Sequence, residues 1–117
     1  MQKRFYVMII SLVGYMGSGK TTVGKRLSEN LNLNFVDLDD YIVSNEKRSI
    51  KDIFSEKGEI YFRKIENSCL DTVLNTDNIV LSPGGGTPVY YNNMELINSK
   101  SISFYLKMSP AELTERL

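Results

Sequence analysis

The sequence predicts an α/β fold, a three-layer sandwich in which helices cover both faces of a mostly parallel β-sheet. The first observation is an apolar run at residues 6–13 that leads directly into a glycine-rich loop. The second is that short β-branched segments alternate with longer segments whose apolar residues recur every three or four positions. The third is the length of 117 residues, which suits a single domain. Strands separated by helices run parallel, because each helix returns the chain to the edge where the previous strand began.

Periodicity and turn residues place the individual elements. We predict strands at residues 6–13, 34–38, 79–82 and 102–106. We predict helices at residues 20–31, 39–46, 50–57, 59–74 and 92–99, and a last one that begins at residue 110. Ser49 is predicted to cap the third helix, with Asp52 three residues later, and Gly58 to end it. The inner stripe of the helix at 59–74 is predicted to be Phe62, Ile65, Cys69 and Val73.

Composition and charge exclude several classes of function. Fourteen basic and fourteen acidic residues cancel, so we expect neither nucleic acid nor an anionic membrane surface as a partner. Histidine is absent, which excludes histidine metal sites and a histidine general base. The single cysteine, Cys69, lies on a predicted apolar stripe, so we expect a core residue in a cytoplasmic protein. We expect the protein to be a monomer that acts on a small molecule.

Residues 3–13 allow a second interpretation, as the charged and short apolar parts of a signal peptide. A strand inside a parallel sheet has the same apolar composition, because both of its faces are covered. The glycine-rich loop and the amphipathic helix that follow favour the strand. No apolar run approaches the roughly 20 residues that span a bilayer.

The strongest motif is a phosphate-binding loop, Gly-Tyr-Met-Gly-Ser-Gly-Lys-Thr, at residues 14–21. Its glycines allow backbone N–H groups to turn inward and surround phosphate oxygens at the positive end of the following helix. Lys20 is expected to neutralise the β- and γ-phosphates, and the Thr21 hydroxyl to bind Mg²⁺. The position between a buried strand and an amphipathic helix favours this interpretation over an ordinary glycine turn. The sequence therefore predicts ATP, or a close relative, with magnesium.

Acidic residues follow the second predicted strand. Asp37 and Asp39 are two apart on extended chain, so their side chains are expected to face one crevice, where an aspartate helps to hold the magnesium. Capping of the next helix is the alternative, since acids are favoured at a helix start. We assign capping to Asp40 and favour a functional role for the other two.

Two further features bear on a second ligand. Spacing alone makes Arg63 a surface arginine paired with Glu59 or Glu66. The glycines at residues 84–86 directly follow a predicted strand, where backbone without side chains lets a ligand approach the carboxyl edge of the sheet. A loose hinge loop is the alternative for these glycines.

Taken together, these motifs resemble the shikimate kinase family in order and spacing. The matching segments are Gly-Tyr-Met-Gly-Ser-Gly-Lys-Thr-Thr at 14–22, Asp-Leu-Asp at 37–39, Phe-Arg-Lys-Ile-Glu at 62–66 and Gly-Gly-Gly at 84–86. The resemblance covers essentially the whole chain and implies the P-loop fold of nucleoside-monophosphate kinases. It also implies transfer of the γ-phosphate of ATP to the 3-hydroxyl of shikimate, on the route to chorismate and the aromatic amino acids.

The resemblance implies a role for each matching residue. The residues implied to hold ATP are Gly17, Ser18, Gly19, Lys20, Thr21, Thr22 and, against the adenine, Arg116. Thr21 would bind Mg²⁺, and Asp37 would help to place the ion through water. The residues implied to bind shikimate are Asp39 at its hydroxyls, Arg63 at its carboxylate, and Gly84, Gly85 and Gly86 at the loop, with Gly85 in contact through its backbone. Lys20 and Asp39 would be the catalytic residues. An arginine fork suits a planar carboxylate, which favours the functional role of Arg63 over a surface pair.

The sequence departs from the family in two places. Pro83 precedes the glycines where the family usually has a small or apolar residue, and it removes one N–H from the strand end. The chain is also expected to be one kinase domain, residues 1–117, that lacks the family's lid, a later arginine and the last strand. Two alternatives remain open. One is another small-molecule kinase of this fold, such as a gluconate kinase, and the other is a non-catalytic nucleotide-binding remnant.

Overall fold

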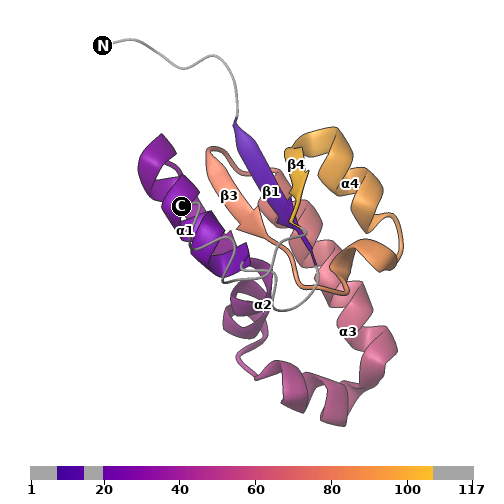
Figure 1. Cartoon of the computed structure of the whole chain (residues 1–117). Coiled ribbons are helices and arrows are strands. Elements are labelled where there is room, and N and C mark those ends of the chain that lie inside the picture. Colours follow the sequence, from indigo (N-terminus) through magenta and orange to yellow (C-terminus); the bar gives the residue numbers. More distant parts are fainter. Residues whose placement is uncertain (1–7, 15–19, 107–117) are drawn as a thin grey trace.

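The computed structural model describes residues 8–14 and 20–106 of the chain (Figure 1). Its centre is a four-stranded sheet in the order β2-β3-β1-β4, and every pairing is parallel. The strands are β1 (Ile9–Val13), β2 (Asn34–Asp37), β3 (Ile79–Ser82) and β4 (Ile102–Tyr105). The predicted α/β class with a mostly parallel sheet is confirmed. Within the described residues, no helix is both long enough and apolar enough to cross a membrane.

The two central strands, β1 and β3, are buried along their whole length, whereas β2 and β4 form the edges of the sheet. Side chains of a strand alternate between its two faces. In β1, Ile10 and Leu12 therefore join one core cluster, whereas Ile9 and Val13 join the other. This explains why the first strand is almost continuously apolar, and it confirms the strand interpretation for residues 9–13.

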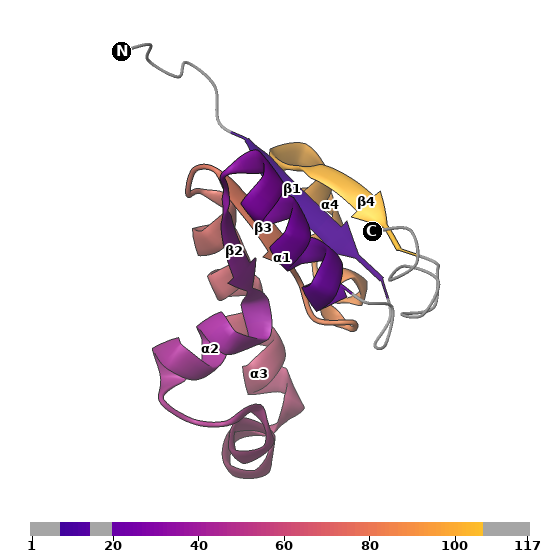
Figure 2. The ribbon, with the colours of Figure 1, turned by 60° about the vertical axis from the view of Figure 1, so that its left-hand side comes forward.

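Helices cover both faces of this sheet (Figure 2). On one face lies α1 (Lys20–Leu31), whose buried Val23 packs with Leu33 beside the strands. On the other face lie α3 (Ile50–Leu74) and α4 (Asn93–Lys100), which enclose the larger core cluster. A short α2 (Leu38–Glu46) follows β2 directly, and a 3₁₀ turn, η1 (Thr87–Val89), follows the glycines after β3.

Local signals set the boundaries of α3. The Ser49 hydroxyl accepts a hydrogen bond from the Asp52 backbone N–H at 3.1 Å, which confirms the predicted cap. Gly58 has φ 89° and ψ 170°, so the helix is interrupted there and two helical segments meet at a kink. This matches the predicted stop at Gly58, because glycine adopts positive φ without the steric cost of a Cβ atom.

Other boundaries differ from the prediction by a residue or so. The strand β2 ends at Asp37, and α2 begins at Leu38, one residue earlier than expected. The helix α4 begins at Asn93 and ends at Lys100, one residue later at each end. The 3₁₀ turn was not predicted. The helix expected from residue 110 lies outside the described residues.

Candidate active site

The candidate site lies at the carboxyl edge of the sheet, where β1, β2 and β3 end side by side. Gly14 follows β1, Asp37 ends β2, and the segment from Pro83 to Gly86 follows β3. Ligands of parallel α/β sheets bind at this edge, because neighbouring strands deliver their loops to one place. Three of the four motifs are therefore brought together by strand pairing alone.

Lys20 is the first residue of α1, and its ammonium donates a hydrogen bond to the Gly14 carbonyl oxygen at 2.8 Å. Burial lowers the pKa of Lys20, while the carboxylates of Asp39 and Asp37 act in the opposite direction. The ammonium thus lies between the end of β1 and the acidic residues that follow β2. Thr21 and Thr22 are exposed in the first turn of α1. Gly17, Ser18 and Gly19 lie outside the described residues, as does Arg116.

The cap of α2 is Asp37 and not Asp40. The Asp37 Oδ1 atom accepts a hydrogen bond from the Asp40 backbone N–H at 3.0 Å, so the assignment of capping to Asp40 is wrong. The cause is the early start of α2, which makes Asp40 the third helical residue and therefore the donor. A capping carboxylate retains further lone pairs, so Asp37 can also accept from a hydrated ion.

Asp37 and Thr21 fit the needs of magnesium. Mg²⁺ keeps several waters and takes one or two protein carboxylates together with phosphate oxygens. In the described part of the chain, no group of three or more acidic, cysteine or histidine side chains could hold a metal ion. One carboxylate and one hydroxyl match the few protein ligands that such an ion takes when phosphate oxygens and water complete its shell.

Asp39 lies against the glycine segment that follows β3. A Cβ atom built on Gly84 would lie 3.1 Å from Oδ1 of Asp39 and 3.4 Å from its Oδ2. Burial raises the pKa of the Asp39 carboxyl, nearby Asp37, Glu66 and Asp40 raise it further, and Lys20 opposes them. Gly84 is thus a close-approach glycine, and the Asp39 carboxylate lies between the glycine loop and the phosphate-loop lysine.

Arg63 lies against the same loop, beside Gly86. A Cβ atom built on Gly86 would lie 3.2 Å from Nη2 and 3.3 Å from Nη1 of Arg63. Nη1 of Arg63 donates to both carboxylate oxygens of Glu66, at 3.0 and 3.2 Å. The two side chains are 16% and 2% exposed, so the interpretation of Arg63 as a surface arginine is wrong.

A buried polar network supports this pair. The Thr87 hydroxyl donates to Oε2 of Glu66 at 2.8 Å, and the Asn93 side-chain amide donates to the Thr87 carbonyl oxygen at 2.8 Å. Asn67 donates in turn to the Asn93 side-chain oxygen at 2.6 Å. Thr87 and Asn93 are fully buried. The network ties α3, the turn η1 and α4 together beneath the glycine loop.

Comparison with known proteins identifies the family. The family model described as shikimate kinase matches residues 16–117. A shikimate kinase of Azobacteroides pseudotrichonymphae is 50% identical over 109 residues, which cover 92% of this chain and 64% of that protein. One of Parabacteroides distasonis is 45% identical over 108 residues, which cover 92% of this chain and 62% of that protein. The chain belongs to the shikimate kinase family.

Solved structures agree with this assignment. A shikimate kinase from Bacteroides thetaiotaomicron superimposes with a TM-score of 0.85 at 41% identity, covering 96% of this chain and 64% of that one. A shikimate kinase from Acinetobacter baumannii in complex with shikimate gives 0.84 at 37% identity, covering 94% and 61%. A gluconokinase from Sinorhizobium meliloti gives 0.55 at 18% identity, covering 97% and 65%, and shares the fold alone. The chain spans just under two thirds of the length of these relatives.

The burial of the Glu66 carboxylate was not predicted from the sequence. Ile65 was predicted on the inner stripe of α3, but it is only partly buried, whereas Glu66 is 1% exposed. A signal existed, because residues 62, 66, 69 and 73 recur at helical spacing and place Glu66 on the inner face. A glutamate on such a face requires a buried partner, which is Arg63.

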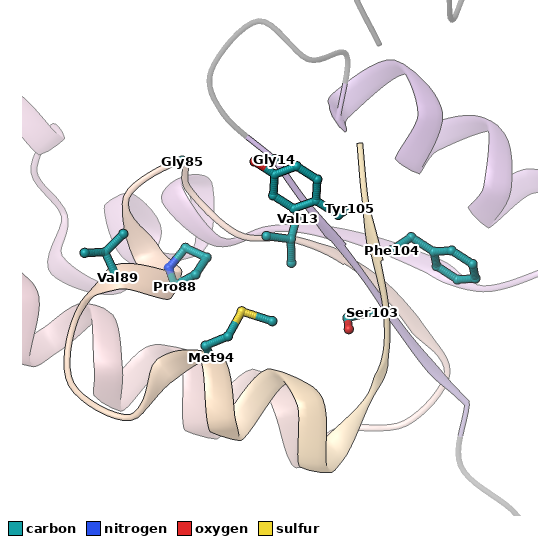
Figure 3. Close-up of a pocket in the computed structure, with 9 residues that line it drawn as sticks. All are labelled: Val13, Gly14, Gly85, Pro88, Val89, Met94, Ser103, Phe104 and Tyr105. Atoms are coloured by element: carbon teal, nitrogen blue, oxygen red, sulfur yellow. The ribbon is translucent and has the colours of Figure 1, made fainter. Parts of the chain in front are cut away.

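A separate hollow of about 320 Å³ lies between β4, α4 and the glycine loop (Figure 3). It is lined by Val13, Gly14, Gly85, Pro88, Val89, Met94, Ser103, Phe104 and Tyr105. Gly14 and Gly85 border it, so it adjoins the candidate site, while Asp39 and Arg63 do not line it. Its mostly apolar lining distinguishes it from the charged part of the site.

Proposed function

We propose that this chain carries the nucleotide and acceptor sites of a shikimate kinase, which transfers the γ-phosphate of ATP to the 3-hydroxyl of shikimate. The observation that carries the proposal is that Asp39 packs against Gly84 while Arg63 packs against Gly86. Two residues of chain span at most about 7 Å. A carboxylate and a guanidinium thus both lie against one short loop, an arrangement that suits a small ring bearing hydroxyls and a carboxylate.

Each acceptor-site residue has a chemical role in this proposal. The Arg63 guanidinium binds the shikimate carboxylate through a planar fork of donors. Asp39 orients the reacting hydroxyl and accepts its proton while the phosphoryl group is transferred. The close approach of backbone at Gly84, Gly85 and Gly86 leaves room for the ring, and Gly85 contacts it through the backbone.

The phosphate side of the site follows from the loop chemistry. Backbone N–H groups at Gly17, Ser18, Gly19 and Thr22 would surround the phosphates of ATP, and Lys20 would neutralise charge on the phosphates during transfer. Thr21 and Asp37 would hold Mg²⁺, which would supply positive charge to offset that of the phosphates during transfer. Arg116 would pack against the adenine, as the resemblance implies. We further propose a cytoplasmic monomer whose partner is a small molecule, with no part for nucleic acid or membrane.

Calorimetry with two ligands tests the division of the site. Arg63→Ala and Asp39→Asn should each weaken shikimate binding by about tenfold or more, because each removes a charge-assisted hydrogen bond. Both should leave the Mg·ATP dissociation constant within twofold of the parent value. Arg48→Ala is the matched control, since Arg48 is an exposed arginine that pairs with Glu56.

The result also separates the rival functions. Gluconate that binds more tightly than shikimate would favour the gluconate kinase alternative. Mg·ATP binding without affinity for either acceptor would favour the non-catalytic nucleotide binder. Unchanged shikimate affinity in Arg63→Ala would withdraw the acceptor assignment.

A further inference from the structure

The Arg63 guanidinium is surrounded by two aromatic rings and the glycine loop, in addition to its ion-pair partner Glu66. Its guanidinium carbon lies 3.9 Å from the centroid of the Tyr90 ring and 5.2 Å from that of Phe62. Glu66 occupies Nη1, and the Gly86 backbone lies beside Nη1 and Nη2. The short distance to Tyr90 is that of a planar guanidinium stacked on an aromatic face, a contact that arginine makes and lysine does not reproduce.

The Nε atom of Arg63 is the second observation that points to Tyr90. It is buried, and it has no hydrogen-bond partner among the described residues. A buried N–H without a partner costs free energy, so it requires a structural reason. The Tyr90 ring supplies one, because an aromatic face that covers the guanidinium keeps water away from it without offering a hydrogen bond.

Tyr90 is itself held firmly. Its backbone N–H donates to the Thr87 carbonyl oxygen at 3.4 Å, and its own carbonyl accepts from the Asn93 backbone N–H at 3.2 Å. The buried Asn93 side chain donates to the same Thr87 carbonyl oxygen. Pro88, inside the turn η1, further restricts the backbone. The ring is therefore presented to Arg63 from a rigid turn.

We propose that Tyr90 is a positioning residue for the acceptor site, whose ring fixes the Arg63 guanidinium in place for a carboxylate ligand. The inference rests on the proposed function, since it takes Arg63 as the group that receives the shikimate carboxylate. Stacking limits the rotation of the guanidinium and removes water from its face. Both effects strengthen an ion pair with a ligand, because fewer side-chain rotamers are lost on binding and the local dielectric is lower.

The first test compares Tyr90→Leu, Tyr90→Phe and the control Tyr91→Leu by calorimetry with shikimate. Tyr91 is the neighbouring tyrosine and is 59% exposed. Tyr90→Leu should raise the shikimate dissociation constant by about 3- to 30-fold, the range expected for a cation–π contact in a partly desolvated site. Tyr90→Phe keeps the aromatic face and should stay within twofold, as should Tyr91→Leu. The Mg·ATP dissociation constant should not change in any of the three.

Variants of Arg63 separate this inference from the proposed function. If Arg63→Ala leaves shikimate affinity unchanged, the acceptor assignment fails. If Arg63→Ala weakens binding but Tyr90→Leu does not, only the role of Tyr90 is overturned. In an Arg63→Lys background, Tyr90→Leu should add less than twofold, because the planar group on which the ring acts is gone. Full additivity of the two substitutions would contradict the proposal.

A measurement without shikimate completes the test. The Arg63 Nε–H proton should exchange slowly with water in ¹⁵N NMR spectra, and Arg63→Lys assigns its signal. Tyr90→Leu should accelerate this exchange at least about tenfold, while Tyr90→Phe should leave it unchanged. Should Tyr90→Leu fail to fold, the parent protein still decides the question, since a rapidly exchanging Nε–H there would show that the ring does not cover the group.

Discussion

Glu66 lies one turn after Arg63 on α3, with 3.0 Å between Oε1 of Glu66 and Nη1 of Arg63, and only 1% of Glu66 is exposed. Removal of one partner from a buried pair leaves a charge without compensation. We therefore expect Glu66→Ala to lower the free energy of unfolding by about 3 kcal/mol, measured by urea denaturation. The control is Glu56→Ala, whose partner Arg48 is exposed, and it should cost less than about 1 kcal/mol. Equal losses in the two variants would contradict the buried-pair account.

Lys20→Ala should remove most of the affinity for Mg·ATP without unfolding the protein. Loss of a hydrogen bond to a charged group costs about 1.5–3 kcal/mol, which corresponds to a dissociation constant about 10- to 150-fold larger. The exposed Lys25 of the same helix provides the control variant Lys25→Ala. Calorimetry on both variants checks this. An affinity of Lys20→Ala for Mg·ATP equal to that of the parent would contradict the assignment of residues 14–21 as a phosphate-binding loop.

Gly84→Ala should displace the Asp39 carboxylate. The added Cβ atom would lie 3.1 Å from Oδ1 of Asp39 and 3.2 Å from Oγ1 of Thr87, tighter than ordinary contacts. We expect shikimate affinity to fall on the order of tenfold, since the carboxylate must shift by a few tenths of an ångström, with Mg·ATP affinity unchanged.

Gly58→Ala is the contrasting glycine variant. It has open space around the added atom but a φ of 89° and a ψ of 170°, so it should cost about 1–3 kcal/mol of stability with shikimate affinity preserved. Loss of shikimate affinity in both glycine variants would indicate a general effect on the fold.

Cys69 should be protected from thiol reagents in the folded protein. Burial raises the pKa of the Cys69 thiol, and the charge of Glu46 raises it further, so the reactive thiolate is disfavoured. At pH 8 we expect labelling at least about 100-fold slower in buffer than in urea. Cys69 is the single cysteine, so all of the signal reports this residue.

The same shift in pKa predicts a pH dependence of stability. Its contribution is fully present below the ordinary thiol pKa of 9.0 and is lost as the pH rises through the higher value of the folded state. The free energy of unfolding should therefore fall less steeply above pH 9 in Cys69→Ala than in the parent. Parallel curves for the two proteins would contradict the assigned burial.

A comparison of residues 1–117 with the same residues joined to the remaining third of a relative tests what the family lid contributes. Phosphoryl transfer requires preorganised cations in a site without water, and an arginine that clamps the phosphates is worth about 10³-fold or more in rate. The chain of residues 1–117 should bind Mg·ATP but should convert it to ADP very slowly when shikimate is present. A chain extended with the remaining third of a relative should turn over much faster at the same concentration. Comparable rates for both would show that the lid is dispensable.

Local features of this protein could be predicted from the sequence, because each depends on interactions among residues that are close together in the chain. The limits of α1, the hydrogen bond from Asp52 to Ser49 and the break at Gly58 all match the prediction. Each depends on hydrogen bonds within one helical turn or on the φ range open to a single residue. The order of strands and helices likewise follows from hydrophobic periodicity, which persists whatever the tertiary contacts.

Tertiary structure alone decided which polar groups are buried together. Asp39 and Arg63 are 24 positions apart in the sequence, yet both lie against the loop that follows β3, because α2 and α3 pack against each other. The i,i+3 spacing of Arg63 and Glu66 was interpreted as a surface pair, whereas Glu66 is buried and also accepts a hydrogen bond from Thr87. The contact between the Tyr90 ring and the Arg63 guanidinium could not be predicted from the sequence either, since it depends on the turn η1. The physical reason is that the cost of burying a charge depends on every group around it, and those groups come from segments far apart in the chain.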